Sequence, residues 1–262
     1  IKRYFDTKTL QEKLAHRRAV FEEIQADYQE GKVEAALIHL NDLGIFRTDE
    51  QDMREFKEHL YIEFLDKAER QFRAHNFSEA IHYYELIIDY GPRTTQILHE
   101  HLAQSYNANQ QIQKAISKYN ELILNNYHPL ESYLALAQIF DKTLQQPEEA
   151  IKYYELASKR AIASYKSIFG DAYPLVISGQ SVPDEHYYLY TGLADAYLKT
   201  GNPERALKAI KWNVSMWPDS SANYVTAAQA FYETGKQRRA CNALAIARRL
   251  GYEERLNIGC GF

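Results

Sequence analysis

The apolar residues of this chain recur at helical spacings over most of its length, and short polar or glycine-containing breaks interrupt them. Spacings of three, four and seven residues place apolar side chains on one face of an α-helix. The clearest example is the stretch 187–220, where two helical patterns meet at Thr200, Gly201 and Asn202. Pro203 follows in the first turn of the second pattern, where its fixed φ and missing N–H cost nothing. We therefore predict a helix-turn-helix hairpin in this stretch.

Small and large packing residues alternate in this hairpin. Ala194 and Ala206 would let the two helix backbones approach closely, while larger side chains fill the gaps around them. The larger packing residues and the proline that ends the unit are Tyr190, Leu193, Tyr197, Ile210 and Pro218. This order resembles the 34-residue tetratricopeptide repeat. Because one hairpin cannot bury its own apolar face, it predicts neighbouring repeats.

Alanines in the second helix of each hairpin mark the other repeats. Ala80, Ala115 and Ala150 follow one another at 35 residues, and Ala240 follows Ala206 at 34. The step from Ala150 to Ala206 is 56 residues, about 22 more than one repeat needs. We assign the excess to a helix extended to about residue 169 and to an inserted loop.

The helical pattern divides the chain into five parts. They are a degenerate N-terminal helix pair at 1–48, repeats at 49–166, an apolar inserted loop at 167–186, two further repeats at 187–252, and a C-terminal tail at 253–262. In the first pair we expect helices at 9–28 and 33–43. The next helix is expected to be capped by Thr48 or Asp49 and to end near residue 74. The tail is expected to hold no more than one turn.

The resemblance to the tetratricopeptide family covers nearly the whole chain, most clearly residues 61–252. It implies an all-α fold, a right-handed superhelical solenoid of antiparallel helix hairpins with five to six repeats. In this family the first helix of each repeat lines a concave groove that holds a peptide, a partner helix or an extended segment.

Composition and charge agree with a helical, noncatalytic protein. The 262 residues include 45% apolar and 25% charged residues, with only 11 glycines and 7 prolines, which is typical of a folded helical chain. A net charge of −4 argues against a nucleic-acid partner, whose phosphates are neutralised by Lys and Arg. No run of 18 apolar residues exists, so no direct membrane span is expected. The chain begins at Ile1 and lacks a signal-peptide core, which suggests a mature or excised fragment.

Two cysteines, Cys241 and Cys260, are too few for a disulfide framework. We expect Cys241 to be a small helix residue and Cys260 to be a thiol in the tail. Neither then indicates a redox compartment. A soluble protein of the cytoplasm or of the periplasm is compatible with the sequence.

No catalytic, metal or cofactor pattern is recognisable in the sequence. There is no phosphate-binding glycine loop and no nucleophile elbow. His99 and His101 lie two apart, so on a helix their rings point to different sides and cannot share a metal. The tyrosine pairs at 83–84 and 153–154 fall at packing positions, which favours a core role over base stacking. We therefore expect no enzyme activity, no metal and no cofactor.

The resemblance then implies a noncatalytic scaffold for protein–protein interaction, within a larger bacterial protein or assembly. The alternative is an accessory or regulatory domain of a larger enzyme, or of a secretion or signalling assembly, whose catalytic part lies outside this chain. A nucleic-acid-binding helical repeat is a third reading, and it would need a basic concave stripe.

Chaperone-docking members of the family grip a C-terminal carboxylate with Lys, Asn and Arg at set positions. The matching positions here hold Leu65, Glu69, His101, Glu131 and Ala135. The acidic residues among them would repel a carboxylate. A partner of the carboxylate-clamp type is therefore not expected.

The repeat register predicts which residues face the groove. The residue after each small packing position of a first helix turns out of the hairpin and toward the groove, which gives a polar ladder of Gln104, Gln138, Asp195 and Gln229. Apolar and aromatic anchors lie beside it at Leu134, Tyr188, Val225 and Tyr232. An ordinary solvated helix face would show the same residues, so this alternative stays open.

The insertion is a second candidate for binding a partner. Pro174, Gly179 and Pro183 are expected to stop any helix through it. Its apolar residues, Tyr173, Leu175, Val176 and Ile177, would expose a sizeable patch unless they are covered. They either fold back onto the solenoid or form a flap for a partner.

Overall fold

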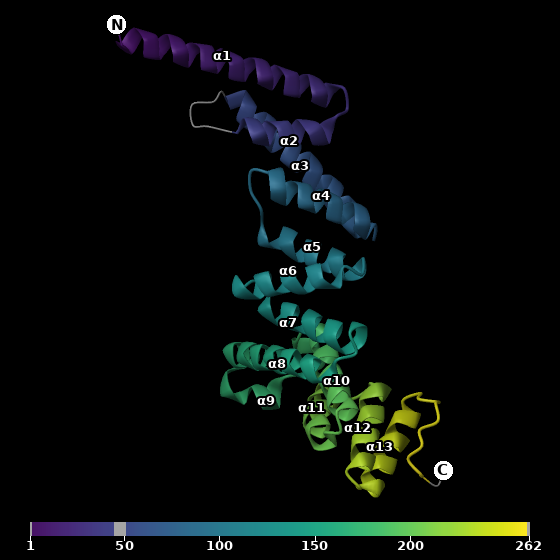
Figure 1. Cartoon of the computed structure of the whole chain (residues 1–262). Coiled ribbons are helices and arrows are strands. Elements are labelled where there is room, and N and C mark those ends of the chain that lie inside the picture. Colours follow the sequence, from purple (N-terminus) through teal and green to yellow (C-terminus); the bar gives the residue numbers. More distant parts are fainter. Residues whose placement is uncertain (1, 45–50, 261–262) are drawn as a thin grey trace. The chain divides into compact units, whose positions relative to one another are not determined.

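The computed structural model describes residues 2–44 and 51–260, and all regular elements in this part of the chain are helical (Figure 1). The α-helices are α1 (Lys2–Gln29), α2 (Val33–Leu43), α3 (Gln51–Arg73), α4 (Phe77–Tyr90), α5 (Gln96–Ala108), α6 (Ile112–Leu124), α7 (Pro129–Gln138), α8 (Pro147–Phe169), α9 (Tyr173–Val176), α10 (Glu185–Lys199), α11 (Pro203–Met216), α12 (Ser221–Glu233) and α13 (Gln237–Arg249). The all-α prediction is confirmed. None of the described helices combines the length and apolar character that a membrane span needs.

The helix bounds follow the apolar pattern closely. The helix expected at 33–43 is α2, whereas the first helix begins seven residues earlier than expected, at Lys2. The expected caps Thr48 and Asp49 lie outside the described residues, and the helix that follows them is α3. Gly201 adopts a φ of 69° in the turn between α10 and α11, a left-handed conformation that glycine accepts without steric cost.

Contacts divide the chain into two compact units at Lys118 and Tyr119. In the N-terminal unit, α1 packs on α2, and α3 packs on α4. Large side chains fill the space between these helices and have almost no exposed surface, among them Phe21, Leu40, Leu60, Phe64 and Tyr84. This burial is what stabilises the pairs, because apolar area removed from water contributes about 25 cal/mol per Å².

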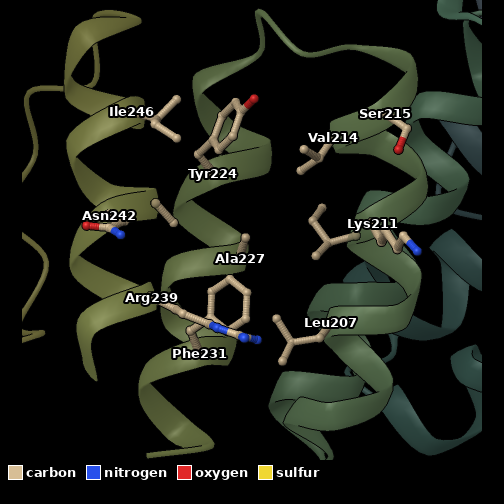
Figure 2. A pocket seen from close by; sticks show the side chains of 12 residues that line it. Leu207, Lys211, Val214, Ser215, Tyr224, Ala227, Phe231, Arg239, Asn242 and Ile246 are labelled. Carbon is tan, nitrogen blue, oxygen red and sulfur yellow. The ribbon is translucent and has the colours of Figure 1, made fainter. Parts of the chain in front are cut away.

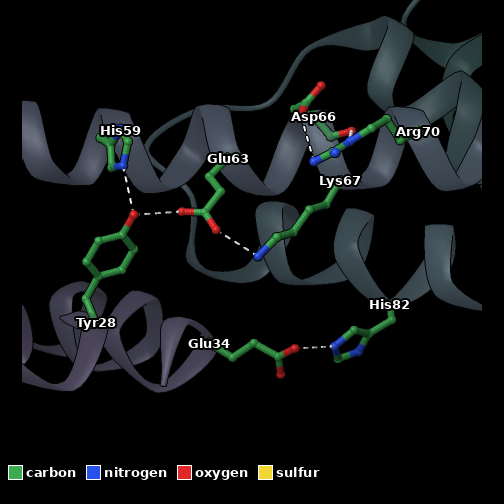
Figure 3. A network of polar contacts seen from close by, with 8 residues as sticks. All are labelled: Tyr28, Glu34, His59, Glu63, Asp66, Lys67, Arg70 and His82. Carbon is green, nitrogen blue, oxygen red and sulfur yellow. Dashed lines mark hydrogen bonds and ion pairs between the residues drawn. The ribbon is translucent and has the colours of Figure 1, made fainter. Parts of the chain in front are cut away.

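A polar network lies on the surface of the N-terminal unit (Figure 3). The Tyr28 hydroxyl of α1 donates to Glu63 of α3 at 3.1 Å and lies 3.0 Å from the His59 ring. Lys67 approaches the same carboxylate at 2.8 Å. Pairs exposed in this way contribute about 0–1 kcal/mol each, so the network orients α1 against α3 more than it stabilises the unit.

The C-terminal unit packs three hairpins, α7 with α8, α10 with α11 and α12 with α13. The helices approach at fully buried small residues, including Ala150, Ala194 and Ala206. Gly192 of α10 shows how tight this approach is, since a Cβ there would overlap the buried ring of Tyr154. The small-and-large packing inferred from the hairpin pattern is therefore what holds these helices together.

The fourth repeat departs from regular geometry at its turn. A π-helical segment, Ile139–Thr143, continues α7 toward the turn before α8. A π-helical turn holds one residue more than a regular α-helical turn, so this segment accommodates an extra residue before α8. The segment turns Asp141 inward, where the buried carboxylate accepts a hydrogen bond from Lys199 of α10 at 2.7 Å.

The insertion is more structured than expected. Helix α8 ends at Phe169 as predicted, but a short helix, α9, begins at Tyr173 and holds Pro174 in its first turn. At Pro174 the expectation of no helix was wrong, because proline in the first turn of a helix loses no hydrogen bond. Two short 3-10 turns, Gly170–Ala172 and Gly179–Ser181, flank α9.

The insertion lies against the C-terminal unit through some of its residues and leaves others exposed. Tyr173 stacks on Trp212 of α11, with ring centroids 6.0 Å apart, and Ile177 packs against the core. Gly179 lies so close to the Trp217 indole that a Cβ would collide with it. Leu175 is 89% exposed and Val176 54%. The insertion therefore packs on the C-terminal unit through some side chains and exposes other apolar side chains to solvent.

The expectation of a free thiol in the tail was wrong. Cys260 forms a disulfide with Cys241 of α13, 19 residues earlier. The tail turns back after α13, so that Ile258 is buried at 2% exposure and Gln237 donates to the Gly259 carbonyl at 3.3 Å. The count of two cysteines did not exclude a single bridge, because pairing depends on where the tail turns rather than on composition.

Candidate functional site

The first helices of the three C-terminal hairpins, α7, α10 and α12, lie side by side. We call their shared surface the first-helix face. Two polar contacts join the helices: Lys199 bonds to Asp141 at 2.7 Å, and the Thr226 hydroxyl donates to Asp195 at 3.3 Å. Both contacts cross from one repeat to the next, so they fix the relative positions of neighbouring first helices.

A hollow of ≈ 420 Å³ lies between α7 and α10 on this face. Three residues predicted for the groove meet in it. Leu134 forms its base at 5% exposure, Gln138 is half-buried, and Tyr188 is 56% exposed. Glu131, Ala135, Lys142 and Glu185 complete the lining. We call it the α7–α10 hollow.

A larger hollow, ≈ 920 Å³, shares Tyr188 with the first and is bordered by the insertion. Three aromatic rings line it. Tyr187 meets Trp217 edge to face at 5.4 Å and Tyr188 at 5.5 Å, and its hydroxyl lies 2.8 Å from the Ser220 hydroxyl. The insertion contributes 178–180 and the loop after α11 contributes 217–220. We call this the insertion hollow.

The two hollows carry excess negative charge. Asp184 and Asp219 line the insertion hollow, and none of the described residues that line it is basic. Glu131 and Glu185 line the α7–α10 hollow, where Lys142 is the one basic lining residue. Four carboxylates beside the exposed Tyr188 ring and the half-buried rings of Tyr187 and Trp217 favour a cationic ligand group, through charge attraction and through cation–π contact.

The other predicted groove residues do not join these hollows. Asp195 is half-buried between α10 and α12, where burial raises the pKa of its carboxyl above the ordinary value. Gln229 is exposed on α12 and donates to Glu233 at 3.1 Å, Tyr232 is exposed, and Val225 is half-buried. Gln104 is exposed on α5, in the N-terminal unit.

Sequence reasoning missed Tyr187, Trp217 and the insertion backbone at 178–180 as parts of this site. The residues it named in the insertion lie elsewhere. Tyr173 and Ile177 pack against the core, while Leu175 and Val176 are exposed outside both hollows. The sequence offered one signal for them. A Trp–Pro pair directly follows the second helix of this hairpin, and a tyrosine pair opens the first helix.

Two of the positions compared with the carboxylate clamp contact each other in the N-terminal unit. His101 lies 2.8 Å from the Glu69 carboxylate, and the Tyr84 hydroxyl also donates to Glu69 at 2.8 Å. His101 also stacks on Phe72, with ring centroids 4.5 Å apart. These side chains therefore make contacts within the N-terminal unit.

Comparisons with known proteins agree with the fold. Residues 191–245 match the family model described as a tetratricopeptide repeat. A search of curated proteins returned no match.

Similar solved structures share the fold at low identity. A crystal structure of MamA protein has a TM-score of 0.57 at 16% identity, covering 75% of this chain and 97% of its own. YrrB, described as a TPR protein with an unusual peptide-binding site, has a TM-score of 0.57 at 12% identity, covering 77% and 93%. PilF of Pseudomonas aeruginosa has a TM-score of 0.52 at 11% identity, covering 76% and 79%.

Proposed function

Because this chain carries a tetratricopeptide repeat and folds as tetratricopeptide-repeat proteins do, we propose that it is a noncatalytic scaffold that binds a partner protein on its first-helix face. The observation that carries the proposal is the pair of adjoining hollows that meet at Tyr188. Exposed aromatic residues at the centre of a polar surface are the usual anchors of protein interfaces.

The chemistry of the hollows defines the segment that they would accept. Leu134 and Tyr188 offer an apolar base and an aromatic wall, and Gln138 offers amide hydrogen bonds to an extended backbone. The surrounding carboxylates select lysine or arginine side chains over acidic ones. The partner is therefore an extended or helical protein segment with at least one basic side chain, and not a C-terminal carboxylate or a nucleic acid.

The test recovers partners by pull-down with the full chain and compares two variants with the unchanged protein. Tyr188→Ala removes the shared anchor, and Gln138→Trp fills the α7–α10 hollow. Lys208→Glu on α11 is the control, since Lys208 is exposed and lines neither hollow.

The recovered segment is then synthesised and its affinity measured. We expect Tyr188→Ala and Gln138→Trp to weaken binding more than tenfold, which is about 1.4 kcal/mol, with the melting temperature little changed. The control should bind within twofold of the unchanged chain. Unchanged affinity in both Tyr188→Ala and Gln138→Trp would contradict the proposal. Loss of binding in Lys208→Glu alone would also contradict it.

A further inference from the structure

A second groove lies between α11 and α13, with α12 forming its floor (Figure 2). Its volume is ≈ 400 Å³ and most of its lining is apolar. Leu207 and Val214 come from α11, Tyr224 and Phe231 from α12, and Ile246 from α13. All five are only half-buried, so the groove keeps apolar surface in contact with water. We call it the second-helix groove.

The charged residues that line this groove are both basic. Lys211 and Arg239 are the charged residues that line it, and Figure 2 shows them on the α11 side and the α13 side. Helix α13 contains four arginines and no acidic residue, and α11 contains three basic residues and one acidic residue. The whole chain carries a net charge of −4. The positive charge at this groove is therefore local and opposite in sign to the chain as a whole.

We propose that the second-helix groove binds an amphipathic helix of another protein, whose apolar stripe enters the groove and whose flanking residues are acidic. The apolar lining extends from Leu207 to Val214 on α11, and the lining on α13 extends from Arg239 at the rim to Ile246. Seven residues make two helical turns, about 10 Å, which matches apolar anchors at i, i+3 or i+4, and i+7 of a bound helix. Glutamates or aspartates beside that stripe would pair with Lys211 and Arg239.

The proposal is independent of the first-helix face. The groove shares no lining residue with the α7–α10 hollow or the insertion hollow. The C-terminal tail lies against another side of α13, where it contacts Gln237 and Cys241. One chain can therefore bind a basic segment on one surface and an acidic helix on the other.

A display library of random 16-residue peptides tests the chemistry of the occupant with the full chain as target. Peptides that bind the unchanged chain are counter-selected on the double variant Lys211→Glu with Arg239→Glu. We expect the retained peptides to share apolar residues at helical spacing flanked by Asp or Glu. Retained peptides with basic flanks, or none that depend on the two rim residues, would overturn the proposal.

Fluorescence polarisation then gives affinities for one retained peptide. The rim double variant should bind at least tenfold more weakly, and Ile246→Asp, which places a carboxylate on the apolar wall, should do the same. Lys236→Glu with Arg249→Glu is the matched control, because it changes the net charge equally at exposed positions outside the lining. Equal loss in the control would show nonspecific charge attraction and contradict the groove.

Sedimentation velocity of the chain alone tests whether a second copy of the chain occupies the groove instead of a partner helix. We expect a sedimentation coefficient that does not depend on concentration. Self-association that the rim double variant abolishes would make a second copy of the chain the occupant, and the proposed partner helix would then be wrong.

Discussion

The two surfaces of the C-terminal unit, the first-helix face and the second-helix groove, are built from the same repeats but differ in chemistry. Carboxylates and tyrosines, of which Tyr188 is exposed, line the hollows at α7 and α10. Apolar residues with a basic rim line the groove at α11 and α13. Repeat geometry sets where a surface can form, and the residues at its exposed positions decide what can bind there.

Helix α12 shows how one element serves both surfaces. Tyr224 and Phe231, seven residues apart, lie in the second-helix groove. Gln229 lies at a different angle around the helix, and Thr226 bonds to Asp195 of the first-helix face. Because residues three, four and seven apart share a helix face, a change of one or two positions moves a side chain from one surface to the other.

The largest effect is expected from removing the disulfide, which should weaken binding at one surface more than at the other. Cys241 anchors the tail to α13, which borders only the second-helix groove. Closing a loop of this length stabilises a fold by about 3 kcal/mol. Reduction, or Cys260→Ser, should lower the melting temperature in calorimetry and weaken acidic-helix binding more than binding at Tyr188. An unchanged melting temperature after complete reduction would show that the bridge does not constrain the unit.

Overpacking should instead damage both surfaces together. Ala206 of α11 is fully buried in the hairpin with α10, and a larger side chain must push the two helices apart. Ala206→Trp should cost ~1 to 3 kcal/mol of unfolding free energy, measured by chemical denaturation. Lys208→Ala, on the exposed side of the same helix, serves as the control. Matching denaturation curves for the two variants would contradict the hairpin packing described above.

A smaller effect is expected where the insertion joins the first-helix face. Tyr173→Ala removes the ring that stacks on Trp212, and it should loosen the insertion and the hollow beside it. A half-buried aromatic contact contributes about 1 kcal/mol. Limited proteolysis should spare residues 173–177 in the unchanged chain and cleave them faster in the variant. Rapid cleavage of the unchanged chain would favour a mobile flap for a partner over a docked segment.

The smallest effect depends on pH. His186 of α10 is buried against Tyr165, 2.5 Å from its hydroxyl, and burial lowers the pKa of the imidazole although Glu131 and Glu185 oppose this shift. The unfolded chain therefore binds this proton more readily, so stability is lost as pH falls below the ordinary histidine value of about 6.5. Between pH 7.5 and 5 the unchanged chain should lose more melting temperature than His186→Gln. Parallel losses would exclude His186 as the source.

Much of the fold of this protein could be predicted from the sequence, because its core residues recur at regular spacings. Apolar spacing and small residues such as Ala194 and Ala206 predicted the hairpins, since local helix formation and close packing depend on residues a few positions apart. The register also predicted that Leu134, Gln138 and Tyr188 belong to one surface, and in the structure they line one hollow. Whether that hollow binds a partner stays a prediction.

The remaining features depend on segments that meet across long stretches of sequence without a repeat to relate them. Only the tertiary structure shows that the tail returns Cys260 to Cys241, and that Gly179 of the insertion packs on Trp217. The same holds for the second-helix groove, whose walls come from helices separated by α12. Helical period determines which way a side chain faces, but which distant residues it meets is decided by how the helices pack.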